Sequence, residues 1–219
     1  MPLQNRVDPY GRLHAVAARG AWMGNRGVLH DEARRVVAPW RLRRWITCVL
    51  EFKDRHREVF APRRYSELFF LDEATSLAAG HRPCAECRRA RYDEFRRAFG
   101  LRSSGAKGPL PGADAMDRVL HAERVTREGE KRIHPAALSA LPAGVLVEHA
   151  GRACLWWNGR LLPWSFWGYG RAVAAPPGTR VDVLTPRSIV RAIRAGFHPQ
   201  VHASADALAR ERPDADAAR

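Results

Sequence analysis

The sequence predicts an α+β fold in two parts, a small metal-binding domain of sheet and helix followed by a small β meander with a helix. Three observations lead to this prediction. Short apolar runs in the first 60 residues are separated by turn signals, and a Cys-x-x-Cys motif lies where a helical pattern begins. In the C-terminal half an Asn-Gly pair joins two apolar runs, which is typical of a β-hairpin.

Composition divides the chain into four segments. Residues 101–115 are rich in Ser, Gly and Pro and are predicted to be a linker. The linker separates a metal-binding domain over residues 1–100 from a small α+β segment over residues 116–202, and residues 203–219 are expected to be a disordered tail. A chain of 219 residues is long enough to bury a hydrophobic core in this arrangement.

The N-terminal half is expected to begin with β structure over residues 15–60. A hairpin is predicted with strands at 21–23 and 28–30, because Gly24-Asn25-Arg26-Gly27 between them is a turn signal. The other elements predicted here are strands at 44–52 and 68–70 and helices at 72–80 and 85–99.

The C-terminal half is expected to contain a helix at 116–125, a three-stranded meander and a final helix. Thr185 is a candidate N-cap of the final helix, Pro186 suits its first position and Gly196 suits its end. The strands of the meander are predicted at 145–149, 153–157 and 161–164.

The charge balance indicates a polyanionic partner. Lys and Arg number 37 against 23 Asp and Glu, a net charge of +14. Such a surplus favours nucleic acid, with DNA the expected form, over an anionic membrane surface. The sequence has no apolar run of about 18–20 residues and no signal-peptide pattern, so we expect a cytoplasmic protein without a membrane partner.

Cys84 and Cys87 have the spacing with which two thiolates hold one metal ion. A helix that begins between them would direct its N–H groups at the sulfurs and favour thiolate. A redox pair usually follows the first strand of a βαβ unit, and this pair follows a β-rich segment and a short helix. We therefore predict a zinc ion, with Cys48 as a third ligand.

Residues 68–89, with the sequence LFFLDEATSLAAGHRPCAECRR, resemble the second half of the metal-binding domain of Ada-type DNA-repair proteins. The resemblance covers residues 44–100 and implies the zinc fold of that domain, with Cys84 and Cys87 carried over as ligands and Cys48 as the third. In that family four cysteines bind zinc, and one of them accepts a methyl group from a DNA phosphotriester.

The fourth ligand departs from the Ada pattern, since Phe52 stands where a second cysteine of the preceding pair is expected. Three cysteines and one histidine form a normal zinc site. His30 is the favoured candidate because it lies beside the predicted hairpin. The alternatives are His56, His81 and Cys154.

Arginines next to the cysteines are candidates for phosphate contacts. Arg41, Arg43 and Arg44 precede the predicted 44–52 strand, and Arg82, Arg88 and Arg89 flank the Cys-x-x-Cys motif. A third set, Arg187, Arg191 and Arg194, follows one face of the final helix. The alternative is that these arginines form an ordinary solvated surface.

Three functions are compatible with these features. The first is a basic, zinc-containing nucleic-acid-binding protein in DNA repair or regulation, with the zinc structural. The second is an enzyme acting on DNA, either a cysteine-dependent methyl acceptor or a nuclease. The third is a zinc-stabilised module that binds protein. The first is preferred because it accounts for both the cysteines and the net charge.

Overall fold

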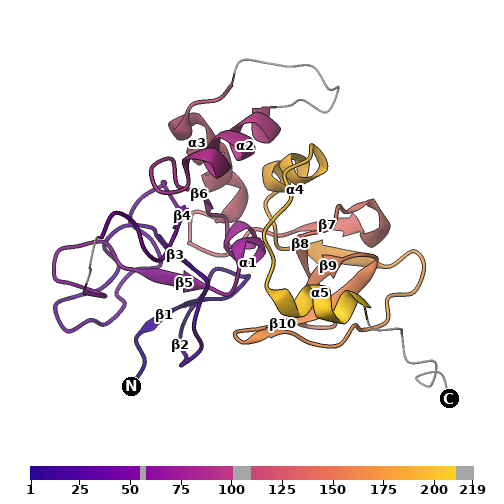
Figure 1. The fold of residues 1–219 in the computed structure, drawn as a ribbon, viewed down its shortest axis with the longest axis horizontal. Coiled ribbons are helices and arrows are strands. Elements are labelled where there is room, and N and C mark those ends of the chain that lie inside the picture. The colour runs from indigo at the N-terminus through magenta and orange to yellow at the C-terminus, as the bar shows by residue number, and fades with distance from the viewer. Residues whose placement is uncertain (55–57, 101–109, 211–219) are drawn as a thin grey trace.

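The computed structural model describes residues 1–54, 58–100 and 110–210. Within these residues the chain forms two six-stranded sheets and five α-helices, which confirms the α+β class. The first sheet belongs to the N-terminal half and the second to the C-terminal half, and they lie on opposite sides of α1 (Figure 1). None of the helices in the described ranges has the length and apolar character needed to cross a bilayer.

The first sheet has the strand order β2-β1-β5-β3-β4-β6. β1 is parallel to β5 and β4 is parallel to β6, while the other neighbours are antiparallel. The order is not the order of the chain, so this sheet depends on contacts between distant segments. Its strands are β1 (Gln4–Val7), β2 (Leu13–Ala15), β3 (Trp22–Asn25), β4 (Ile46–Cys48), β5 (Leu68–Phe70) and β6 (Arg82–Pro83).

The hairpin predicted at residues 21–30 is wrong. Gly24 lies inside β3, which pairs with β4 and β5, and residues 28–30 contribute only a single bridge from His30 to Val36. A Cβ at Gly24 would come 2.3 Å from the carbonyl oxygen of Ile46 and 2.9 Å from the ring of Phe70. The glycine therefore permits a close approach between strands, where the sequence pattern had suggested a turn.

Helix α1 (Glu73–Ala78) confirms the helix predicted at 72–80. Asp72 caps it by accepting a hydrogen bond from the amide of Thr75 at 2.7 Å, and Gly80 follows it with φ +93°. All six residues of the helix are buried, because it contacts both β5 and β8. Helix α2 (Arg89–Gly100) starts later than the predicted residue 85, since residues 85–88 form turns around the cysteines.

The second sheet confirms the predicted meander. Its order is β11-β10-β9-β8-β12-β7. The two tight turns are at Ala150-Gly151 and Asn158-Gly159, and all four residues have positive φ, as type I′ hairpin turns require. The strands are β7 (His134–Ala137), β8 (Val145–His149), β9 (Arg152–Trp157), β10 (Arg160–Ser165), β11 (Gly168–Tyr169) and β12 (Arg180–Val183), with a short 3₁₀ turn at Leu138–Ala140.

The final predicted helix is α4 (Arg187–Arg194), and its N-cap differs from the expected one. The hydroxyl of Thr185 accepts from the amide of Leu146, and Glu123 instead accepts from the amide of Ser188 at 2.7 Å. Glu123 lies in α3 (Ala113–Arg124), which starts three residues before the predicted helix and inside the range assigned to the linker. Gly196 follows α4 with φ +100°, as its position after the helix predicted.

The chain after α4 forms a further helix. α5 (Ala203–Arg210) occupies the first part of the range predicted to be a disordered tail, and Ala205 is fully buried against the second sheet. The rest of that range, residues 211–219, and residues 101–109 of the predicted linker lie outside the described residues. Burial of one helix face explains why the tail prediction failed for residues 203–210.

The two halves share one core. Leu77, Tyr92 and Phe95 from the N-terminal half pack in the same buried cluster as Val147 and Phe197 from the C-terminal half. The predicted linker thus separates the two sheets in sequence, but it does not separate two independent cores.

Candidate metal centre

Three cysteines meet where β4 ends and the chain passes from β6 towards α2. Cys48 is the last residue of β4, and the parallel pairing of Thr47 with Pro83 places Cys84 beside it. The amide of Cys84 donates to the carbonyl oxygen of Thr47 at 2.9 Å. The turns that follow bring Cys87 to the same point, so that the three sulfurs lie within 4.8 Å of one another and could hold a metal ion.

Contacts within the cluster favour the thiolate form of Cys84. The neighbouring thiols of Cys48 and Cys87 hydrogen-bond to its sulfur and lower the pKa of Cys84, and the amide of Glu86 also donates to it at 3.4 Å. The same contacts raise the pKa of Cys48, because its thiol holds a proton that Cys84 accepts. A metal ion would displace these protons, since the thiolate is the form that binds metal.

A cavity of about 510 Å³ opens beside the sulfurs. Its walls combine apolar side chains with the carboxylates of Glu51, Glu67 and Glu86, and no Lys or Arg lines it among the described residues. Glu67 is buried and accepts from the amide of Phe60 at 2.9 Å. Glu86 stands between two of the cysteines, so its position was visible in the sequence, whereas nothing in the sequence linked Glu51 or Glu67 to the site.

His30, the expected fourth ligand, is not part of the cluster. Its Nδ1 is 2.6 Å from the hydroxyl of Ser66 and its Nε2 is 3.2 Å from the carbonyl oxygen of Ala61. Its ring stacks on Phe60 with centroids 4.4 Å apart. Both ring nitrogens of His30 are therefore engaged by other groups. His30 does not reach Cys48 because the predicted hairpin that would have placed it there does not form.

The other candidates are placed as follows. His81 is fully buried, its Nε2 lies 3.3 Å from Nε of Arg26, and burial lowers its pKa, so it is a neutral core residue. Cys154 is buried in the second sheet, where desolvation raises its pKa to about 11. His56 lies outside the described residues. The described part of the chain therefore supplies three ligands, Cys48, Cys84 and Cys87.

Two of the arginines expected to contact phosphate are buried in ion pairs. Arg82 forms two 2.8 Å hydrogen bonds with Asp117 of α3, and Arg88 lies 2.8 Å from Glu73 of α1. Their exposed fractions are 1% and 6%, so the expectation that they contact nucleic acid is wrong. Their carboxylate partners come from separate helices, which the local sequence around the cysteines does not indicate.

The remaining four arginines of that prediction are exposed. Arg89 pairs with Asp93 one turn along α2, an arrangement that screens little of its charge. The other three, Arg41, Arg43 and Arg44, lie in the loop before β4.

Comparison with protein families, with curated proteins and with solved structures finds no match for this chain. Its function is therefore inferred from its own residues.

Proposed function

We propose that this chain is a zinc-containing protein that binds nucleic acid, with the metal holding the fold together. The observation that carries the proposal is the meeting of Cys48, Cys84 and Cys87 within a protein of net charge +14. The resemblance of residues 68–89 to the Ada metal-binding domain supports a role in DNA repair or regulation, with DNA as the polyanion.

Zinc suits this set of donors. Zinc–sulfur bonds of about 2.3 Å in a tetrahedral site place two sulfurs about 3.8 Å apart, and the three sulfurs here lie within 4.8 Å of one another. Soft thiolates also select zinc over magnesium or calcium. The chain joins its first sheet to α2 at this point, so an ion held by all three cysteines would tie these elements together.

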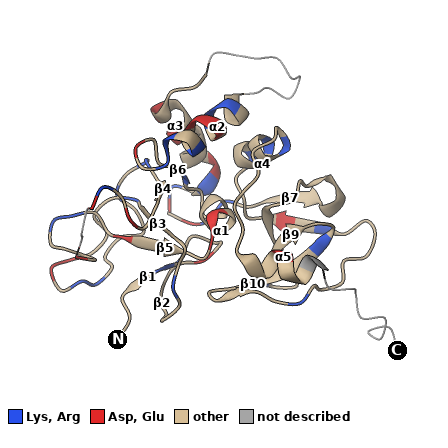
Figure 2. Cartoon of the chain, in the orientation of Figure 1, with Lys and Arg blue, Asp and Glu red and all other residues tan. Residues whose placement is uncertain are grey.

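Exposed arginines in the loop before β4 are the proposed phosphate contacts. Arg41, Arg43 and Arg44 line a groove of about 400 Å³ together with Arg118, Asp114 and Asp117 of α3. Lys and Arg are also spread over elements of both halves (Figure 2). Such contacts hold the phosphate backbone without reading bases, so we infer binding with little sequence preference.

The zinc site and this loop are linked through β4. Arg44 lies four positions before Cys48, and an extended chain of that length spans about 13 Å. Zinc bound to Cys48 would fix one end of the strand, and the arginine loop begins at the other end. We therefore expect the metal to support nucleic-acid binding indirectly.

The test is a charge reversal. Arg41→Glu/Arg43→Glu/Arg44→Glu should retain zinc and lose most of its affinity for duplex DNA at low salt. The slope of log affinity against log salt should become shallower by about 2.7, because about three phosphate contacts are lost.

The matched control is Arg187→Glu/Arg191→Glu/Arg194→Glu, which changes the net charge equally at three exposed residues of α4. It should weaken binding less than the first variant. Equal losses in the two variants would show that net charge alone attracts DNA. No binding of wild-type protein to duplex or single strands at low salt would reject the proposal.

A further inference from the structure

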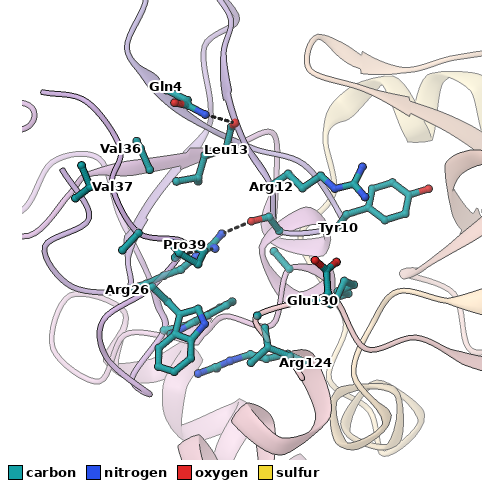
Figure 3. Close-up of a pocket in the computed structure, with 18 residues that line it drawn as sticks. Gln4, Tyr10, Arg12, Leu13, Arg26, Val36, Val37, Pro39, Arg124 and Glu130 are labelled. Atoms are coloured by element: carbon teal, nitrogen blue, oxygen red, sulfur yellow. Dashed lines mark hydrogen bonds between the residues drawn. The ribbon is translucent and has the colours of Figure 1, made fainter. Parts of the chain in front are cut away.

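A second cavity, of about 500 Å³, lies away from the cysteines and shares no lining residue with the cavity beside them. The turn between β1 and β2, the loop before β4 and the segment after α3 form its walls. Arg26 and Arg124 both lie among the residues that line it (Figure 3). Its volume falls within the range of about 300–1,000 Å³ that is typical of small-molecule sites.

Three buried cations gather at this cavity, whose lining also includes the exposed Arg12. Arg26 and Arg124 are 1% and 0% exposed, and their guanidinium groups stack against Trp45, with centroid distances of 4.3 and 3.9 Å. Lys131 is partly exposed as a residue, but its ammonium group is buried. The sequence did not indicate this cluster, because Arg26 is far in the chain from Arg124 and Lys131.

The hydrogen-bond partners of these cations are neutral. Among the described residues, the buried Nε group of Arg124 has no hydrogen-bond partner. Arg26 donates to the carbonyl oxygens of Gly11 and Pro39 and to the neutral ring of His81. Arg124 donates to the carbonyl oxygens of Gly80 and Arg43, and Lys131 donates to that of Ala78. Carbonyl groups satisfy donors, but they do not neutralise charge.

Carboxylates are too few to balance the cluster. Asp8 is the carboxylate that interacts with both Arg26 and Lys131, and it already accepts from the amide of Arg12 and from His14. Asp117 interacts with Arg124 but is held by two hydrogen bonds from Arg82, and Glu130 lies at the exposed rim.

The imbalance has an energetic consequence. Burial lowers the pKa of Arg26, Arg124 and Lys131 below their usual values. Guanidinium groups remain charged in proteins, so the lowered pKa values of the two arginines express a free-energy cost of burying charge. Burial lowers the pKa of Lys131 to about 7, so an anion beside it would favour its charged form at neutral pH. Buried charges in proteins are normally paired, and an anion in this cavity would supply the missing partner.

We propose that this cavity binds a nucleoside monophosphate, with the phosphate towards Arg26, Arg124 and Lys131. Charge-assisted hydrogen bonds from such groups are the usual means of holding a phosphate. Much of the remaining lining is apolar or aromatic and would pack against the nucleoside; it includes Leu13, Val36 and Val37 with Tyr10 and Trp40. The ligand is a free nucleotide or the phosphorylated end of a strand, since both present the same chemistry.

The experiment is calorimetric titration of the full-length protein with adenosine monophosphate, adenosine, inorganic phosphate, and a short oligonucleotide with and without a 5′-phosphate. We expect the nucleotide to bind and adenosine not to bind. Binding of the phosphorylated strand in preference to the free nucleotide would identify a strand end as the source. No binding of any phosphorylated probe would overturn the proposal, and equal affinity for inorganic phosphate would overturn the nucleoside part.

The variant Lys131→Met tests whether Lys131 binds an anion or only stabilises the fold. The substitution removes a buried cation that Asp8 balances only in part, so the ligand-free variant should melt no lower than wild type, while nucleotide affinity falls by about tenfold or more. Lys53→Met, which changes the charge equally beside the other cavity, should leave affinity unchanged. A ligand-free Lys131→Met protein that melts lower than wild type would overturn the proposal.

This inference does not depend on the proposed nucleic-acid function. The variant Arg41→Glu/Arg43→Glu/Arg44→Glu should still bind the nucleotide, because none of its altered side chains lines the cavity. Loss of duplex binding with retention of nucleotide binding would therefore separate the two sites.

Discussion

Cys84 is the residue on which the proposed metal centre depends most directly. Its amide ties it to β4, and its sulfur accepts from both neighbouring thiols. These contacts favour the ionised form that a metal ion requires. Cys154 has the same side chain and is also buried, but desolvation in an apolar sheet raises its pKa. Position, and not residue type, distinguishes a ligand from a core thiol here.

Substitutions at Cys84 and Cys154 provide a matched test of the metal centre. Cys84→Ser should reduce the zinc content from about one ion per chain towards zero and should lower the melting temperature, because zinc binding contributes directly to folding. Cys154→Ser should retain the metal. Elemental analysis of protein purified without chelator measures the content. Absence of zinc from wild-type protein, or equal zinc in both variants, would contradict the assignment.

Cys48 is the residue to which the Ada resemblance would assign methyl transfer, and we predict that it does not accept a methyl group from DNA. The cavity that reaches the sulfurs is lined by Glu51, Glu67 and Glu86 and by no Lys or Arg among the described residues. These carboxylates would repel the phosphate backbone that carries a phosphotriester. Cys48 is also buried, with only 7% of the residue exposed.

Mass spectrometry of zinc-loaded protein after incubation with methylated DNA decides between the two functions. The expected result is an unchanged mass. A gain of one methyl group mapped to Cys48 would instead identify the chain as a repair enzyme, and Cys48→Ser would then be the control that abolishes the gain.

At the scale of elements, helix ends are tied to segments far away in the sequence. Glu123 of α3 accepts from the amide and the hydroxyl of Ser188 and so caps α4 from outside. Asp72 caps α1 and also accepts from the hydroxyl of Tyr169 at 2.7 Å and from the amide of His202 at 3.0 Å. A capping residue of this kind fixes both its own helix and the position of its neighbours.

Asp72→Ala should therefore lower the free energy of unfolding by about 3 kcal/mol, since it leaves several buried donors without a partner. Tyr169→Phe removes one of these bonds and should cost about 1 kcal/mol. Asp114→Ala, at an exposed carboxylate in the first turn of α3, should stay within about 0.5 kcal/mol of wild type. Urea denaturation measures all three. A loss at Asp72 no larger than that at Asp114 would show that the network contributes little.

At the scale of the whole molecule, the arginines serve two purposes. Arg26, Arg82, Arg88 and Arg124 are buried between elements, where they bind carboxylates or carbonyl oxygens. Others, such as Arg41, are exposed and available for an anionic partner. The net charge of +14 is a property of both groups, so only part of it can contact nucleic acid directly.

The sequence by itself predicted what local patterns determine. Asn158-Gly159 predicted a hairpin of the meander, because Asn and Gly readily adopt the positive φ that a type I′ turn requires and that both residues show. Asp72 and Gly80 marked the ends of α1. The Cys-x-x-Cys spacing predicted two of the three clustered sulfurs, and Cys48 on a strand supplied the third.

Tertiary structure alone decided the rest, because pairing between distant segments carries no local signal. Gly24 could serve a turn or a close strand contact, and only the partners of β3 selected the second. His30 contacts Ser66 and Ala61 through its ring nitrogens and is not part of the sulfur cluster. Whether an arginine is exposed or buried beside a carboxylate depends on which helix packs over it, and the free energy of burying a charge is set by that neighbour.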